Sequence, residues 1–230
     1  MVASAHISLY SASVTLTQTL VPEAFDSAIT PEAKYSFSVY PLSSVVSFVA
    51  RVKVGGSVTK TIRGVIPTAK QEYCEAVVGG ETAGFLEQIE EDVFTMQLGN
   101  IPLDKGTEVD VDIAYVTELK HDSEVDGIRF TIPTAVAPRY RASPEELYLT
   151  HVQGGLEVNV QIDMLGPVTG VQSSSHLIAV TMGSLDSPGS LNQEFNNAQA
   201  PAKLSQSRVY LESVFIFKLC AKTPNPQERS

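Results

Sequence analysis

Tryptophan is absent from this chain of 230 residues, and cysteine occurs only twice. A single distant pair, Cys74 and Cys220, does not make the framework of a small disulfide-rich protein, and it offers no zinc-binding spacing. No run of about 18 apolar residues occurs, so no segment is predicted to cross a membrane as a helix. These absences favour a reduced protein without a structural metal.

The first twenty residues, MVASAHISLYSASVTLTQTL, lack both the basic start and the apolar centre of a secretory signal peptide. The chain also contains no Asn-x-Ser/Thr acceptor for N-linked sugar. Together with the scarcity of cysteine, these features lead us to expect a cytoplasmic location.

Charge is scarce and uneven. Charged residues make up 18% of the chain, and the formal net charge is −10. Between Glu81 and Asp126 there are 13 acids but only two basic residues, Lys105 and Lys120. This surplus argues against nucleic acid and anionic membranes as partners. The acidic residues can be explained simply as a solvent-exposed face of the protein. The functional alternative is that they attract a basic protein partner.

Alternating apolar and polar residues predict many short strands. The segments VVSFVARVKV and SVTKTIRGVI flank Gly55-Gly56 and are typical of a β-hairpin. In VDVDIAYVTEL, Val109, Val111 and Ile113 fall on one face and acids on the other. With 13 prolines and 15 glycines breaking the chain, we predict a mainly β protein, an antiparallel β-sandwich.

One short α-helix is predicted at about 68–78, where Ala69, Tyr73 and Val77 share a face. Gly79 and Gly80 follow it, as expected for a helix C-terminus. A phosphate-binding glycine loop would instead follow a strand and precede a helix, and it would carry Lys-Ser/Thr, so we favour the capping interpretation.

The second part of the chain is also rich in β patterns. We predict a first domain over 1–140 and a β-rich segment over 141–230 that packs on or completes the sandwich, with a flexible loop at about 183–206. The final pattern, Val209–Leu219, is apolar on both faces towards its end. It predicts either a central strand or an edge covered by another chain.

From about Lys34 to Tyr140 the order of elements resembles the VIT (vault protein inter-alpha-trypsin) domain. The matching segments are VYPLSSVVSFVARV, AKQEYCEAVVGGETAGFLEQ, DVFTMQLGNIP, VDVDIAYVTELKHD and IRFTIPTAVAPRY. The resemblance implies a non-catalytic β module that contacts other proteins. In the family a von Willebrand A domain usually follows, and we expect this chain to be a short form without it. The sequence contains no Asp-x-Ser-x-Ser metal motif, so metal-dependent adhesion is not expected.

Acidic residues provide two weak metal-site patterns. Asp122, Glu124 and Asp126, followed by Gly127, match the start of a calcium-binding EF-hand loop, but Pro133 stands where the loop needs a bidentate glutamate. A hairpin turn is the better interpretation. The second pattern is a pair of acids two residues apart on a predicted strand, Asp110 and Asp112, which exposed alternation explains equally well. No metal ligand, cofactor-binding residue or cofactor is predicted.

Residues capable of catalysis are equally sparse. Apart from His121, which stands beside Asp122 in a predicted turn, none of the four histidines has a partner at metal-binding spacing. Surface or capping roles are expected for His6, His121, His151 and His176. No Gly-x-Ser-x-Gly elbow occurs, and Cys74 is expected to be a small helix-packing residue, with partial exposure as the alternative. We therefore predict that the chain is not an enzyme and has no catalytic residues.

The sequence thus predicts a protein-interaction or scaffold module of VIT type. Its partner is expected to be another protein or a second copy of the chain, as in a homodimer. The alternative is a lectin-like, carbohydrate-binding β-sandwich. Tyr140 and Tyr148 near predicted loops are the aromatic residues considered for stacking on a sugar, and the lack of tryptophan weakens that case.

Overall fold

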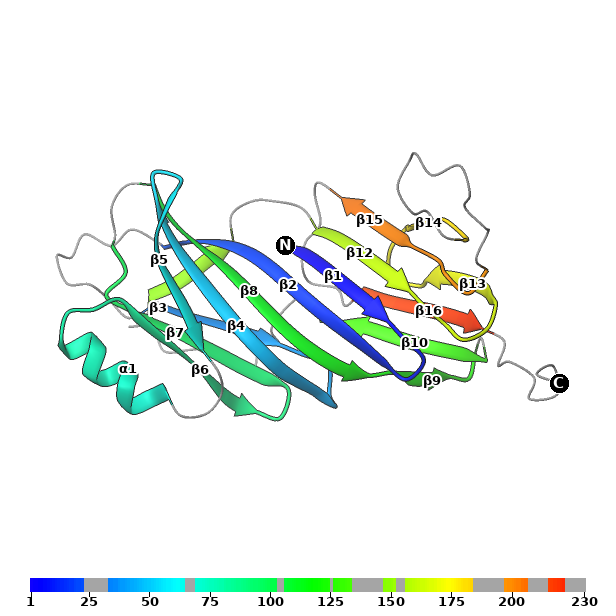
Figure 1. Ribbon diagram of the computed structural model, residues 1–230, viewed down its shortest axis with the longest axis horizontal. Helices are drawn as coiled ribbons and strands as arrows, with labels where there is room; N and C mark the ends of the chain where they lie inside the picture. Colours follow the sequence, from blue (N-terminus) through cyan, green and yellow to red (C-terminus); the bar gives the residue numbers. More distant parts are fainter. Residues whose placement is uncertain are drawn as a thin grey trace. The chain divides into compact units, whose positions relative to one another are not determined.

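A computed structural model describes residues 1–22, 33–64, 69–102, 106–124, 126–133, 147–151, 156–183, 197–206 and 215–221. These residues are mainly β, with one short helix, as predicted (Figure 1). By contacts the chain divides into two compact units. The first contains Met1, Thr15–Tyr115 and Ala135–Gly154, and the second contains Val2–Val14, Val116–Thr134 and Gly155–Ser230.

The first unit is built on one strongly folded sheet with the strand order β5-β4-β8-β2-β11-β3-β7-β6. The outermost strands of this order, β5 and β6, contact each other, so the sheet curls back on itself around a core. Its elements are β2 (Ser11–Pro22), β3 (Ala33–Ser38), β4 (Ser43–Val54), β5 (Ser57–Gly64), α1 (Ala69–Val78), β6 (Ala83–Glu90), β7 (Val93–Gly99), β8 (Thr107–Glu118) and β11 (Leu147–His151).

Strand β8 shows why these residues form strands. Buried and partly exposed residues alternate along it from Thr107 to Tyr115, and Val109, Val111 and Ile113 are at most 1% exposed. The apolar residues enter the core while the acids between them reach solvent, which confirms the alternation predicted from the sequence. The hairpin of β4 and β5 around Gly55-Gly56 is also confirmed.

Helix α1 confirms the predicted helix and the role of the glycines after it. Tyr73 is 7% exposed and packs against Phe85 of β6, with ring centroids 4.8 Å apart. Gly80 has φ +82° and donates its N–H to the Val77 carbonyl at 3.0 Å, while Glu81 N–H reaches the Ala76 carbonyl at 2.9 Å. This pair of bonds is the Schellman ending of a helix, for which glycine is favoured at the left-handed position.

The second unit contains two groups of paired strands, β14-β15-β12-β1-β2 and β13-β16-β10-β9. Its further elements are β1 (Val2–Ile7), β9 (Lys120–Asp122), β10 (Gly127–Ile132), β12 (Leu156–Ile162), β13 (Val168–Ser173), β14 (Ala179–Val180), β15 (Ala202–Gln206) and β16 (Phe215–Ala221). β2 contributes only its first four residues to this unit, Ser11–Val14. Most pairings are antiparallel, but β1 pairs in parallel with β12, and in the first unit β11 does so with β3.

Strand β16 corrects one alternative drawn from the sequence. It lies between β10 and β13 and pairs with both, and Phe215, Phe217 and Leu219 are at most 1% exposed. The described part of the apolar pattern is therefore a central strand, and the idea that this strand forms an edge covered by another chain is wrong. Its apolar character on both faces reflects burial within its own unit.

The predicted loop at about 183–206 is only partly described. Residues 184–196 lie outside the described residues, whereas Ala202–Gln206 forms β15 and pairs with β12. Ala202 and Leu204 are 5% and 3% exposed, so a short alternation inside a polar stretch was sufficient to make a strand. The domain boundary predicted at residue 140 also lies outside the described residues, and it stays a prediction.

Candidate functional site

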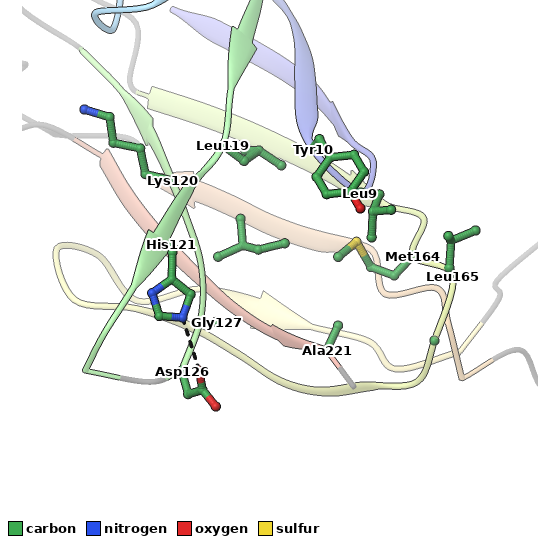
Figure 2. A pocket seen from close by; sticks show the side chains of 12 residues that line it. Leu9, Tyr10, Leu119, Lys120, His121, Asp126, Gly127, Met164, Leu165 and Ala221 are labelled. Atoms are coloured by element: carbon green, nitrogen blue, oxygen red, sulfur yellow. Dashed lines mark hydrogen bonds and ion pairs between the residues drawn. The ribbon is translucent and has the colours of Figure 1, made fainter. Parts of the chain in front are cut away.

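A half-open apolar pocket of about 410 Å³ lies within the second unit. It is formed where the turn between β1 and β2, the residues around β9, the start of β10, the turn after β12 and the end of β16 meet (Figure 2). Its lining residues are Leu9, Tyr10, Leu119, Lys120, His121, Asp126, Gly127, Ile128, Met164, Leu165, Gly166 and Ala221.

The apolar wall combines buried and exposed side chains. Met164 is 9% exposed and forms part of the buried lining, while Tyr10 and Leu165 are 78% and 65% exposed at the mouth. Figure 2 shows Leu9, Tyr10, Met164 and Leu165 grouped together on one side of the pocket. A concave apolar wall with large exposed side chains at its mouth is typical of a binding surface.

Backbone hydrogen bonds fix the turns that carry this wall. Ser8 N–H donates to the Ser11 carbonyl at 2.9 Å, which closes the turn containing Leu9 and Tyr10. The Tyr10 carbonyl accepts from Leu119 N–H at 3.0 Å, and Met164 N–H donates to the Ala198 carbonyl at 3.0 Å. Backbone hydrogen bonds within and between these turns therefore hold the lining in place.

The polar part of the lining includes a contact between an imidazole and a carboxylate. His121 Nε2 lies 3.1 Å from Asp126 Oδ1, with the two side chains 67% and 99% exposed. Asp126 has φ +47°, a left-handed conformation that aspartate and asparagine tolerate better than most residues. Figure 2 places His121 and Asp126 together on the side opposite Tyr10, and the Lys120 side chain points away from both groups.

The same β9–β10 turn carries a buried ion pair. Lys218 Nζ on β16 lies 3.3 Å from Asp122 Oδ2, with these side chains 8% and 4% exposed, and it also binds Glu124. The hydrogen bond with Glu124, together with the bond and the attraction to Asp122, raises the Lys218 pKa although burial opposes it. Asp122 Oδ1 accepts from Glu124 N–H at 3.0 Å, which shapes the turn.

Similarity to known proteins covers most of the strands of the first unit and part of the pocket. The family model of the vault protein inter-alpha-trypsin (VIT) domain matches residues 1–132, more than half of the sequence. The chain belongs to the VIT family. This confirms the resemblance seen in the segments between Lys34 and Tyr140, and it extends the match to the N-terminal strands β1 and β2.

Three relatives resemble this VIT chain over about half its length. Mouse and human protein mono-ADP-ribosyltransferase PARP4 are 39% and 38% identical over 110 residues, 46% of this chain, and the chain covers 5% and 6% of them. Rat von Willebrand factor A domain-containing protein 5A is 34% identical over 116 residues, 50% of this chain and 14% of the relative. The chain thus spans only a small part of the relatives it matches.

The acids of the VIT strand β8 do not form a metal site with each other. Asp112 Oδ2 lies 2.6 Å from Arg51 Nη1, and Asp110 pairs with Lys53 and accepts from Thr19 Oγ1 at 2.7 Å. Burial raises the Asp110 pKa, but the bonds from Lys53 and Thr19 outweigh it and hold the pKa below its usual range. Among the described residues, no three His, Cys, Asp or Glu side chains gather as metal ligands would.

The EF-hand-like pattern is resolved as a turn. Asp122 and Gly127 are paired across β9 and β10, so these residues close an antiparallel hairpin, as favoured from the sequence. The burial of Asp122 was not predicted, because its partner Lys218 lies far along the chain in an apolar segment. The acids between two short strands did mark this turn in the sequence, but nothing in that segment indicated that one of them would be buried.

The histidines occupy different places. His6 Nε2 lies 2.6 Å from Asp163 Oδ2, whose other oxygen accepts from Gln199 Nε2 at 2.7 Å. His176 Nδ1 lies 2.8 Å from the hydroxyl of the neighbouring Ser175, in an exposed turn. The backbone of His151 belongs to β11.

Neither the His6 cluster nor the His176 cluster lines the apolar pocket. The described residues around them show no arrangement of nucleophile, base and orienting group.

Cys74 corrects a minor prediction. It is exposed on α1, so it is not a helix-packing residue, because Tyr73 beside it takes the buried face. Cys220 on β16 is partly buried.

Of the tyrosines considered for sugar binding, Tyr140 lies outside the described residues and Tyr148 belongs to β11. No described helix is both long and apolar enough to cross a membrane.

Proposed function

We propose that this chain is a non-catalytic protein-binding module of the VIT type. The observation that carries the proposal is the VIT match over residues 1–132, since VIT domains are protein-interaction modules. The apolar pocket with Tyr10 and Leu165 exposed at its mouth supports the same function, because such surfaces commonly bind protein.

A catalytic function has less support. The ADP-ribosyltransferase activity in the name of two relatives belongs to those whole proteins, and this chain covers 5% and 6% of them. Among the described residues, the pocket lining offers one exposed His–Asp pair and no hydroxyl or thiol side chain other than that of Tyr10. A binding role therefore needs fewer additional assumptions than a reaction does.

Peptide display tests the proposal even while the partner is unidentified. The purified chain is used to select from a random peptide library, with bare resin and an unrelated protein of similar net charge as controls. Recurrent peptides that bind the chain in calorimetry, and not the control protein, are the expected result. Failure to enrich any peptide across several library designs would contradict a protein-binding function.

Three finer proposals accompany this one. Self-association no longer has an uncovered β16 to support it, and light scattering over a range of concentrations tests it directly, with a constant monomer mass counting against it. Carbohydrate binding keeps only the exposed ring of Tyr10 as a described stacking surface beside the pocket, and a silent glycan array would end it. Cytoplasmic residence stays a proposal that cell fractionation can test.

A further inference from the structure

We propose that the apolar pocket of the second unit receives one aliphatic or aromatic side chain from a protein partner, and that a basic residue beside that anchor pairs with Asp126. This inference rests on the proposed protein-binding function and assigns it a site. The partner segment is therefore defined by its chemistry, as an apolar anchor next to arginine or lysine.

The size and lining of the pocket fit an anchor side chain. Its volume of about 410 Å³ lies within the range of ordinary ligand pockets, roughly 300–1,000 Å³. Leu9, Leu119 and Met164 supply apolar surface, and the backbone bonds of their turns hold that surface in place before binding. A pocket formed in advance loses less conformational entropy when it is filled.

The two exposed side chains at the mouth favour a partner large enough to cover them. Tyr10 and Leu165 leave 78% and 65% of their surface in water, so a partner that covers them gains further apolar burial. Tyrosine is enriched at protein interfaces because its ring is apolar and its hydroxyl stays solvated. A free small molecule that filled only the pocket would leave this rim uncovered.

Charge selects the residue beside the anchor. The Asp126 side chain is 99% exposed, and among the described residues its Oδ1 lies 3.1 Å from His121 Nε2. Lys120 also lines the pocket, but in Figure 2 its ammonium group points away from Asp126. Because the whole chain carries 26 acids against 16 basic residues, a basic neighbour is favoured both at the rim and during approach.

The Met164 methyl group provides a direct readout. The intact chain is labelled with ¹³C at its methionine methyls, and the Met164 signal is assigned with Met164→Leu. Three blocked dipeptides are titrated: N-acetyl-Leu-Arg-amide, N-acetyl-Leu-Glu-amide and N-acetyl-Ser-Arg-amide. We expect the Met164 signal to shift most with Leu-Arg, less with Leu-Glu and not with Ser-Arg. The signal of Met96, which is fully buried in the first unit, should stay in place.

Matched variants extend the test to the peptides selected by display. Leu165→Asp should weaken their binding about tenfold or more, because it places a charge where the bound partner would cover apolar surface at the mouth of the pocket. Leu177→Asp is its control, because Leu177 is 89% exposed in the same unit and does not line the pocket. Asp126→Asn keeps a residue that tolerates the left-handed backbone, and it should remove the preference for arginine over glutamate without removing the response to leucine.

Several results would overturn the inference. If display yields binding peptides but Leu165→Asp and Leu177→Asp bind them equally well, the protein-binding function stands and this site is wrong. The same holds if Leu-Arg leaves the Met164 signal unchanged. A Met164 signal that moves with protein concentration alone would identify a second copy of the chain as the occupant, and equal responses to Leu-Arg and Leu-Glu would exclude the role of Asp126.

Discussion

Two buried tyrosine hydroxyl groups differ in whether they have a hydrogen-bond partner. Tyr35 and Tyr115 are both buried, at 8% and 1% exposure, and burial raises the pKa of each hydroxyl. The Tyr35 hydroxyl donates to Gln18 Oε1, whereas the Tyr115 hydroxyl has no hydrogen-bond partner among the described residues. Removing the same atom at the two positions should therefore have opposite effects.

Tyr115→Phe should stabilise the protein by about 1 kcal/mol, because it removes a buried hydroxyl that makes no hydrogen bond. Tyr35→Phe should destabilise it by about 1 kcal/mol, because Gln18 then loses a buried donor. Urea unfolding of the two variants and the wild type measures both values. Destabilisation by Tyr115→Phe equal to that by Tyr35→Phe would mean that Tyr115 is hydrogen-bonded.

The Asp110 carboxylate should make the free energy of unfolding depend on pH. Its pKa is held below the usual 3.8 by Lys53 and Thr19 despite burial, so its contribution is complete above that value and is lost as the pH falls through the folded-state pKa. Asp110→Asn should lower the free energy of unfolding by about 1 kcal/mol at neutral pH and by almost nothing at a pH below the folded-state pKa of Asp110. Unfolding of both proteins across this pH range tests the sign, with Glu91→Gln on an exposed turn as control. A difference that grows in acid would contradict it.

At the scale of single elements, a strand or helix could be predicted wherever the residues of that one segment formed the pattern typical of it. The alternation in β8 and the paired glycines after α1 predicted both elements, since side-chain direction and backbone freedom are local properties. The buried pair of Asp122 and Lys218 was not predicted, because it joins β9 to β16 across most of the second half of the chain. No spacing within either segment encodes that contact.

The candidate pocket was missed for the same reason. Its lining comes from five short segments, and each contributes a few residues from a turn or a strand end. Leu9, Tyr10 and Leu165 break the local pattern by placing large apolar side chains in turns, which was the available signal. Their grouping became visible only when the strand pairings of the second unit were known.

Strand β10 begins at a glycine for a steric reason that can be tested. A Cβ atom added at Gly127 would collide with the Leu219 carbonyl of β16, which is backbone and cannot move aside as a side chain can. Gly127→Ala should therefore destabilise the protein by about 2 kcal/mol, as expected for overpacking.

Gly170→Ala is the matched control, because its added Cβ would lie 3.9 Å from the Cβ of Cys220, an ordinary contact. Thermal unfolding of the two variants gives the comparison. Equal melting temperatures for Gly127→Ala and Gly170→Ala would show that β10 and β16 lie farther apart than described.

At the scale of the whole molecule, the dominant feature is a formal charge of −10 over 230 residues. Long-range attraction acts on the approach of a partner, whereas the apolar pocket acts after contact. Composition alone predicts the first effect, and the fold supplies the second. Association and dissociation rates should therefore respond differently to salt.

For basic peptides selected by display, the association rate should fall as salt rises, because the screening length shrinks from about 30 Å at 0.01 M to about 8 Å at 0.15 M. The dissociation rate should change little, since an anchor held by apolar contact is insensitive to screening. Stopped-flow fluorescence measures both rates, and Leu165→Asp should raise dissociation while leaving the salt dependence of association intact. If salt changed only dissociation, the net charge would have no steering role, and the short-range pair with Asp126 would account for the basic preference.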